Sequence, residues 1–152
     1  MSCLAQFRIL LRTIFSRFER VPSRVAPEEK VTRFICSRDH FHPTTGAPKV
    51  GAFLPPESGL SVYRTYSCGE EKIWWLGERY VARKRKDGKP ILARADLVAS
   101  DFFQQNLEIK KHPYPHPRHA NVIGWPEDKP SKRMKATELA NRAIGLIKPV
   151  GS

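Results

Sequence analysis

The chain has few of the features that mark secreted, metal-bound or membrane-spanning proteins. Its three cysteines, Cys3, Cys36 and Cys68, form no C-x-x-C pair, which fits neither a disulfide framework nor a complete zinc-finger pattern. No apolar run approaches the roughly 20 residues that span a bilayer. No complete catalytic or cofactor signature occurs either. The sequence therefore predicts a cytoplasmic protein without a cofactor, whose activity has to be inferred from isolated residues.

Acidic residues are also scarce. Fifteen Asp and Glu stand against 27 Lys and Arg, which gives a formal net charge of +12 at pH 7. A positive field of this kind attracts phosphate backbones and anionic membrane surfaces. The chain is 40% hydrophobic, which is too apolar for wholesale disorder. We expect a folded domain that associates with nucleic acid, RNA or DNA, ahead of a membrane surface, and a soluble basic protein without such a partner is the alternative.

Residues 1–24 predict a basic amphipathic helix, because apolar side chains recur at helical spacing with arginines between them. Glu19 is the only acid in this segment. Such a helix docks on its own domain or on a partner protein, lies on a membrane, or serves as a transit segment. The remaining interpretation is that residues 1–24 are an over-extended start of the sequence and have little structural meaning. The apolar residues are Leu4, Phe7, Leu11, Ile14, Phe15 and Phe18, and the arginines are Arg8, Arg12, Arg17 and Arg20.

Residues 25–30 are predicted to be a linker, and residues 31–152 a compact domain. Short β-like runs alternate with two helical patterns, which indicates the α+β class. We expect a single small domain with a short mixed or antiparallel sheet, a central helix and a C-terminal helix. The predicted strands are residues 31–36, 60–64, 91–97, 107–109 and 121–125, and the predicted helices are residues 68–83 and 132–147.

Local signals refine three of these segments. Ser67 and Glu70 match the S-x-x-E capping box, which predicts the start of the central helix. Residues 91–97 read equally well as a strand or as a short strand that enters a helical turn at residues 95–103. Residues 37–59 are rich in proline and glycine, so we expect a long irregular excursion there, of the kind that is often functional or mobile.

Five histidines form the first candidate constellation: His40 and His42 in the long loop, and His112, His116 and His119 in a proline-spaced segment. Histidine acts as a general acid, a general base or a metal ligand near neutral pH. A zinc site would draw on Cys36, His40 and His42, with a fourth ligand from the later segment. The prolines at 113, 115 and 117 deny His112 and His116 a shared helical face, so no metal site is predicted.

A metal-free site is the simpler chemistry for these residues. One imidazole would remove a proton from a ribose 2′-hydroxyl, another would protonate the leaving oxygen, and an arginine would stabilise the charged phosphorus centre. The candidates for this catalytic set are His119, His40 or His42, and Arg64. The structural alternatives are an ion pair for Arg64 and packing within its own loop for His119.

The second constellation is the basic run at residues 83–89, which follows Trp74, Trp75 and Tyr80 on the central helix. Cations beside exposed aromatic rings hold phosphates while bases stack, whereas Trp74 and Tyr80 in the core would leave only the charge. The sequence does not decide whether the basic groups share a face. The predicted nucleic-acid-binding residues are Arg83, Lys84, Arg85, Lys86, Lys89, Lys110, Lys111 and Arg118.

Two short motifs carry a family resemblance. Residues 60–64 read L-S-V-Y-R and residues 118–126 read R-H-A-N-V-I-G-W-P. They resemble a group of small uncharacterised bacterial proteins with an L-S-V-x-R strand and a later H-A-x-I segment. The similarity spans residues 53–126, and it implies that Arg64 and His119 belong to one site. It implies no particular activity, and residues 1–24 lie outside it.

Three functions follow from these observations. The first is a nucleic-acid-associated protein that binds phosphate backbones, in a setting such as bacterial defence or a toxin–antitoxin pair. The second is a small metal-independent His/Arg enzyme, such as a ribonuclease, acting on RNA or a nucleotide. The third is a protein-interaction subunit of a larger complex, docking through residues 1–24.

Overall fold

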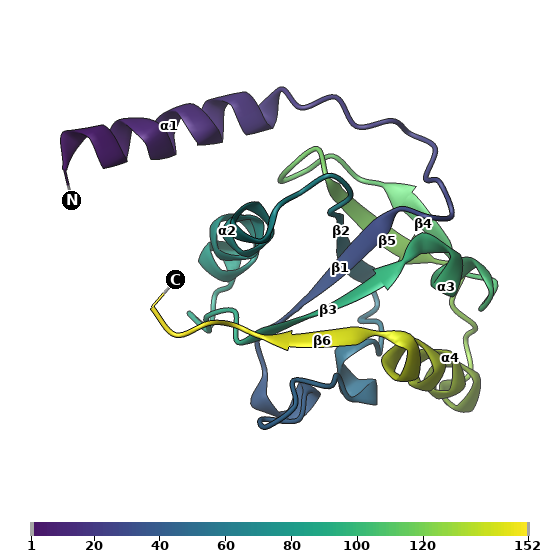
Figure 1. Cartoon of the computed structure of the whole chain (residues 1–152). Helices are drawn as coiled ribbons and strands as arrows, with labels where there is room; N and C mark the ends of the chain where they lie inside the picture. Colours follow the sequence, from purple (N-terminus) through teal and green to yellow (C-terminus); the bar gives the residue numbers. More distant parts are fainter. Residues whose placement is uncertain (1, 152) are drawn as a thin grey trace.

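The computed structural model describes residues 2–151 and consists of one six-stranded antiparallel sheet with helices on both faces (Figure 1). The strand order is β4-β5-β2-β1-β3-β6. The predicted α+β class, the single small domain and the N-terminal helix are confirmed. The strands are β1 (Lys30–Ile35), β2 (Leu60–Arg64), β3 (Ala93–Val98), β4 (Glu108–Lys111), β5 (His119–Ile123) and β6 (Ile144–Ile147), and the helices are α1 (Cys3–Arg17), α2 (Glu70–Tyr80), α3 (Ala99–Phe103) and α4 (Lys129–Arg142).

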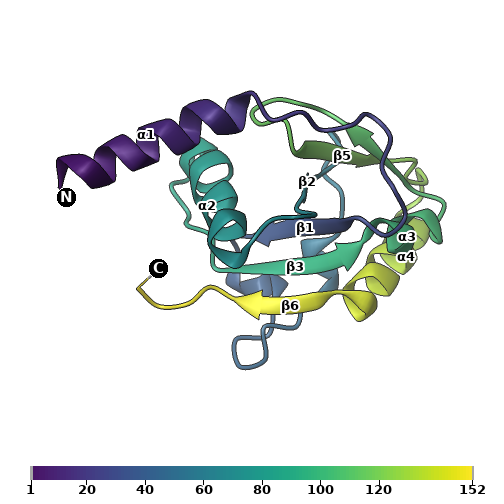
Figure 2. The same ribbon diagram turned by 45° about the horizontal axis from the view of Figure 1, so that its top comes forward.

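The two faces of the sheet belong to two separate cores, because successive strand residues point to opposite sides. Helix α2 covers one face, where Phe34 of β1 and Tyr63 of β2 pack against its apolar side. Helix α4 and the turn Val50–Ala52 lie on the other face, over Val31 and Ile35 (Figures 1 and 2). The long excursion at residues 37–59 thus supplies part of a core as well as loops.

Strand β2 lies at the centre of the sheet and fixes what its neighbours bring together. It pairs with β1, where Thr32 lies opposite Tyr63. It also pairs with β5, where Tyr63 lies opposite His119. The side chain of His119 therefore shares the α2 face with Tyr63, and their ring centroids are 5.3 Å apart.

The predicted C-terminal helix at residues 132–147 is wrong in its last turn. Helix α4 ends at Arg142, and β6 then pairs with β3 through four residues, Ile144–Ile147. A Cβ atom at Gly145 would lie 1.9 Å from the carbonyl oxygen of Gly46. The strand is therefore held by ladder hydrogen bonds and by a close backbone approach to the 37–59 loop, neither of which is visible in the helical spacing of Ile144 and Ile147.

The predicted capping box at Ser67 is also wrong. Ser67 has a positive φ of 57°, and helix α2 starts one residue after its N-cap, Gly69, which makes no side-chain cap hydrogen bond. The helix ends at Tyr80 and continues only as the 3-10 turn Ala82–Lys84. The ambiguous segment after residue 91 contains both predicted forms, since β3 runs directly into α3.

Helix α1 stands apart from the two cores. It runs beside α2 and continues past it, so that its N-terminal half extends beyond the rest of the molecule in both views (Figures 1 and 2). It ends at Arg17, and residues 18–29 lead to β1. Among residues 2–151, no helix has the length and apolar character that crossing a membrane requires.

Candidate functional site around the histidine loop

The proline-spaced histidine segment forms the loop between β4 and β5, against the end of α2. The ring centroids of His116 and Tyr80 are 4.8 Å apart, and His112 Nδ1 lies 3.2 Å from His119 Nδ1. The sequence predicted three candidate imidazoles in this segment, and the structure packs His116 against the end of α2 and brings His112 together with His119. Each of them has a different environment.

His119 is buried and held in a defined orientation. Its Nδ1 lies 2.8 Å from the carbonyl oxygen of His112, to which a ring N–H donates. This hydrogen bond leaves Nε2 as the acceptor for the hydroxyl of Ser61, 2.6 Å away. Burial lowers the pKa of His119, although the hydrogen bond to His112 opposes the shift. A neutral imidazole with a serine hydroxyl on one side and an exposed histidine on the other is equipped to accept a proton.

Ser61 is a member of this site that the sequence analysis missed. It is partly exposed and lies on β2 two residues before Tyr63, so that both side chains face α2. The signal was the alternation of the L-S-V-Y-R strand, which places Ser61 and Tyr63 on one face. The sequence could not show that β5 pairs with this strand, because Ser61 and His119 are 58 residues apart.

His116 serves to attach α1. Its side chain is fully buried, its Nε2 contacts Ser16 Oγ of α1, and its Nδ1 accepts a hydrogen bond of 3.1 Å from the backbone N–H of Arg118. Burial lowers the pKa of His116 from 6.5 to about 4. This histidine is therefore neutral at pH 7 and holds the C-terminal half of α1 to the loop.

Acid should loosen this attachment. The unfolded chain takes up a proton at His116 near pH 6.5, whereas the folded chain resists protonation until about pH 4. The contribution of His116 to stability therefore falls as the pH drops through this window, by on the order of 3 kcal/mol, and His116 causes no further loss below it. The free energy of unfolding, measured between pH 7 and pH 4, should lose this component in His116→Asn and keep it in His42→Asn, at an exposed histidine. An unchanged pH dependence in His116→Asn would contradict this role.

Arg118 has a structural environment that occupies its guanidinium. It is 5% exposed, donates to Glu19 over 2.6 Å, and donates to the carbonyl oxygens of Arg64 and Tyr66 over 2.8 Å each. Burial alone would raise the pKa of Glu19, but Arg118 and Lys72 lower it to about 2. This predicted nucleic-acid contact is thus engaged inside the molecule, where it joins residue 19 to the sheet.

Arg64 is fully buried and paired with Glu29. Its Nε and Nη2 each donate to the carboxylate over 2.8 Å, and Nη2 also donates to the carbonyl oxygen of Arg24 over 3.1 Å. Arg64 follows Tyr63 on β2, so that its side chain leaves the sheet on the side opposite to His119. The structure does not bring these two predicted catalytic residues to one site, and Arg64 ties the segment before β1 to the sheet.

His40 and His42 lie in the 37–59 loop, apart from the β4–β5 loop. The His40 ring packs against Gly51, where a Cβ atom would be 2.7 Å from it, and His42 is exposed. Burial and the charge of Arg33 lower the pKa of His40. Within residues 2–151, no hydrogen bond or ring contact joins either histidine to His119, and no group of three His, Cys, Asp or Glu side chains is placed to hold a metal ion.

The basic run at residues 83–89 is exposed and reaches the histidine loop. Lys84 Nζ lies 4.8 Å from the centre of the Tyr114 ring and 3.3 Å from its hydroxyl. Tyr114 is 68% exposed. Asp87 forms an ion pair with Arg85, over 2.5 Å. We call the exposed residues on either side of this contact the basic surface: Arg83, Lys84, Lys86, Lys89, Lys110, His112 and Tyr114.

The basic surface continues to the free edge of the sheet. Lys110 is exposed on β4, the first strand in the sheet order, and it lines an edge depression of about 550 Å³ together with Ser23 and Pro113. Lys111 is less available, because its Nζ donates to the carbonyl oxygen of Val21 over 2.5 Å. The aromatic residues of α2 do not take part, since Trp74 and Tyr80 are buried in the core.

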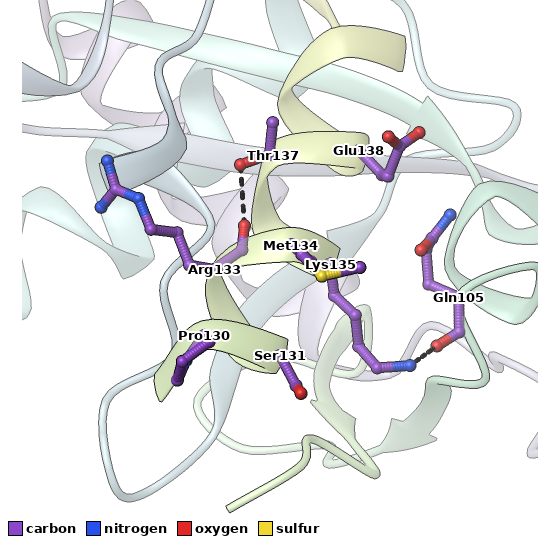
Figure 3. A pocket seen from close by; sticks show the side chains of 8 residues that line it. All are labelled: Gln105, Pro130, Ser131, Arg133, Met134, Lys135, Thr137 and Glu138. Carbon is purple, nitrogen blue, oxygen red and sulfur yellow. Dashed lines mark hydrogen bonds between the residues drawn. The ribbon is translucent and has the colours of Figure 1, made fainter. Parts of the chain in front are cut away.

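A second depression, of about 610 Å³, lies on α4 and contains none of the predicted site residues (Figure 3). Two of its polar groups are already engaged: Lys135 Nζ donates to the carbonyl oxygen of Gln105, and Thr137 donates to that of Arg133 over 2.7 Å. The histidine loop and the basic surface are therefore the better candidate site.

Comparison with known proteins identifies no relative. No family model, curated protein or solved structure matches this chain. The candidate function therefore rests on the geometry of the site.

Proposed function

We propose that the protein binds the phosphate backbone of nucleic acid through its basic surface. The observation that carries the proposal is the contact between Lys84 and Tyr114, because it joins two basic segments that are separate in the sequence into one exposed surface. Cations beside an exposed aromatic ring provide both phosphate contacts and a face on which a base stacks. The cytoplasm is the proposed location, since Cys3, Cys36 and Cys68 are all free thiols, as a reducing compartment maintains them.

The charges of this surface are available to a ligand. Among the described residues, no carboxylate lies within ion-pair distance of Arg83, Lys84, Lys86, Lys89 or Lys110. In contrast, the buried Arg118 and Arg64 are neutralised by Glu19 and Glu29. Phosphate binding is therefore expected from the exposed set and not from the two buried arginines.

Replacing Lys84 and Lys86 with Gln should weaken binding of labelled single-stranded RNA and duplex DNA. Each lost phosphate contact lowers the slope of log affinity against log salt by about 0.7 for single strands and about 0.9 for duplex DNA. Fluorescence anisotropy across a salt series measures both the affinity and the slope. Loss of the Lys84 contact should also release the Tyr114 ring.

The matched control removes the same charge from the opposite side of the sheet, as Lys129→Gln with Arg133→Gln on α4. Both residues are exposed. The control should bind almost as wild type does, with nearly its salt slope. Equal losses in the two double variants would mean that only net charge matters, and would refute a defined basic surface.

A second candidate is a metal-independent enzyme acting on RNA or a nucleotide, and the contact between His112 and His119 favours it. In such an enzyme His119 would accept the proton of the attacking hydroxyl, while the exposed His112 would protonate the leaving oxygen. Cleavage of labelled RNA in the presence of a chelator, lost in both His119→Ala and His112→Ala and kept in His42→Ala, would establish it. Intact RNA with the wild-type protein would rule it out.

A further inference from the structure

Helix α1 presents its apolar side away from the domain. Counting 3.6 residues per turn, six of the eight large apolar residues in 3–18 fall within about 100° of arc. Leu10 lies beside this arc, and Ile9 lies opposite it. Leu4 is 74% exposed, Phe7 57%, Phe15 71% and Phe18 79%. The remaining members of this apolar face are Leu11 and Ile14. An amphipathic helix normally buries such a face, and an exposed apolar patch of this kind marks an interaction surface.

The contacts that hold α1 come from its other side. Ser16, which is buried against His116, lies about 150° around the helix from the centre of the apolar face. Arg12 donates to Glu71 over 3.0 Å, and its guanidinium lies 5.8 Å from the Trp75 ring. The helix is thus attached to α2 by polar contacts and holds its apolar face outward.

The charge around this face is positive. Arg8 and Arg17 flank the apolar face on its two sides and are exposed, as are Arg20 and Arg24 beyond the helix. Glu19 is the only carboxylate in residues 2–24, and Arg118 and Lys72 neutralise it. The segment therefore complements a negatively charged surface, whereas a second copy of α1 would bring like charge against it.

The position of α1 suits a flat partner. In both views the helix is the outermost element on its side of the molecule (Figures 1 and 2). Its 15 residues extend about 22 Å at 1.5 Å per residue, which is too short to span a bilayer. Phenylalanines between flanking arginines are typical of helices that lie in the plane of the lipid headgroups.

We propose that α1 binds the surface of an anionic lipid bilayer, with Phe7, Phe15 and Phe18 inserted and Arg8 and Arg17 at the lipid phosphates. Long arginine side chains reach the headgroups while their methylene stems lie along the apolar boundary. Since the basic surface lies on the β4–β5 loop and the turn after α2, the lipid and the nucleic acid are bound by different residues.

Flotation of the full chain with lipid vesicles tests this proposal. The wild-type protein should float with vesicles of phosphatidylcholine and phosphatidylglycerol, and much less with phosphatidylcholine alone. Phe7→Ser with Phe15→Ser should weaken partitioning at least about tenfold, because burial of one such side chain alone is worth about that factor. This variant leaves every charge in place. Its folding is checked by an unchanged thermal transition, since both residues lie outside the cores.

The matched control is Ile9→Ser, which removes an apolar side chain from the α2 side of the same helix. It should float as wild type does. Undiminished flotation of the Phe7/Phe15 variant would mean that lipid binds basic residues elsewhere, and would overturn the proposal. Absence of wild-type flotation would overturn it as well and would leave the apolar face to a protein groove. The affinity of the Phe7/Phe15 variant for nucleic acid should stay unchanged. Failure of the lipid proposal can therefore be distinguished from failure of the nucleic-acid proposal.

Discussion

Replacing Glu29 with Ala should destabilise the fold by about 3–5 kcal/mol, because it leaves the fully buried charge of Arg64 without its partner. The two residues share two hydrogen bonds of 2.8 Å, and Arg64 is 0% exposed. Chemical denaturation at pH 7 measures this loss directly. The segment before β1 should also become accessible to protease, since Arg64 holds it through the carbonyl oxygens of Pro22 and Arg24.

The neighbouring residue supplies the control for this prediction. Glu28 is exposed, so Glu28→Ala should change the free energy of unfolding by no more than about 0.5 kcal/mol. An equal effect of both substitutions would show that the ion pair contributes nothing specific.

The Glu29 ion pair also gives a pH dependence of known sign. Burial alone would raise the pKa of Glu29, but the hydrogen bonds from Arg64 and from the Ala26 N–H outweigh it and lower the pKa below 4.5. A carboxyl with a lowered folded pKa contributes stability above its unfolded pKa and loses it as the pH falls. The wild-type protein should lose this component below about pH 4.5, and Glu29→Ala should not.

Replacing Asp96 with Ala should be as damaging, at about 3–5 kcal/mol. Arg94 is 0% exposed and lies against the Trp74 ring, 4.8 Å from its centre. Its Nε and Nη2 lie 3.2 Å and 3.1 Å from Asp96 Oδ2. Thr32 donates to the other carboxylate oxygen over 2.7 Å. The substitution therefore leaves a buried guanidinium and a buried hydroxyl without these partners, and thermal or chemical unfolding measures the loss.

Arg94 has a second partner that serves as the control. Glu70 accepts from its Nη2 over 2.7 Å but is 67% exposed. Because the Glu70 carboxylate is mostly in water and Arg94 keeps Asp96 as its partner when Glu70 is removed, Glu70→Ala should cost far less than Asp96→Ala. Similar losses for the two would mean that burial is not what makes the Asp96 contact important.

The sequence predicted the elements whose signals are local. Strand β2 has its predicted bounds, because alternation and β-branched or aromatic residues in 60–64 indicate a strand directly. Helix α2 and the amphipathic pattern of α1 were found for the same reason. The C-terminal half of the predicted last helix failed, because ladder pairing with β3 and the contact of Gly145 with Gly46 overrode a helical spacing.

The candidate site was only partly predictable. Composition predicted a basic protein, and the proline-spaced histidines indicated the β4–β5 loop as a candidate site. The sequence could not show that Arg64 and Arg118 are buried while Lys84 and Lys110 are free. The glutamates that pair with the two arginines lie 35 or more residues away along the chain. The structural alternative that we weighed for Arg64, an ion pair, is the environment that the structure gives it.

By itself, the sequence therefore determined the charge, the fold class and the helical character of residues 3–17, since each depends on composition or on neighbours a few residues away. The tertiary structure alone decided which histidines meet, which cations reach solvent and which way α1 faces. Ser61 meets His119 because β2 pairs with β5, and the contact of Ser16 with His116 helps to hold the apolar face of α1 outward. These are contacts between residues 58 and 100 positions apart, and chain folding, not local periodicity, sets them.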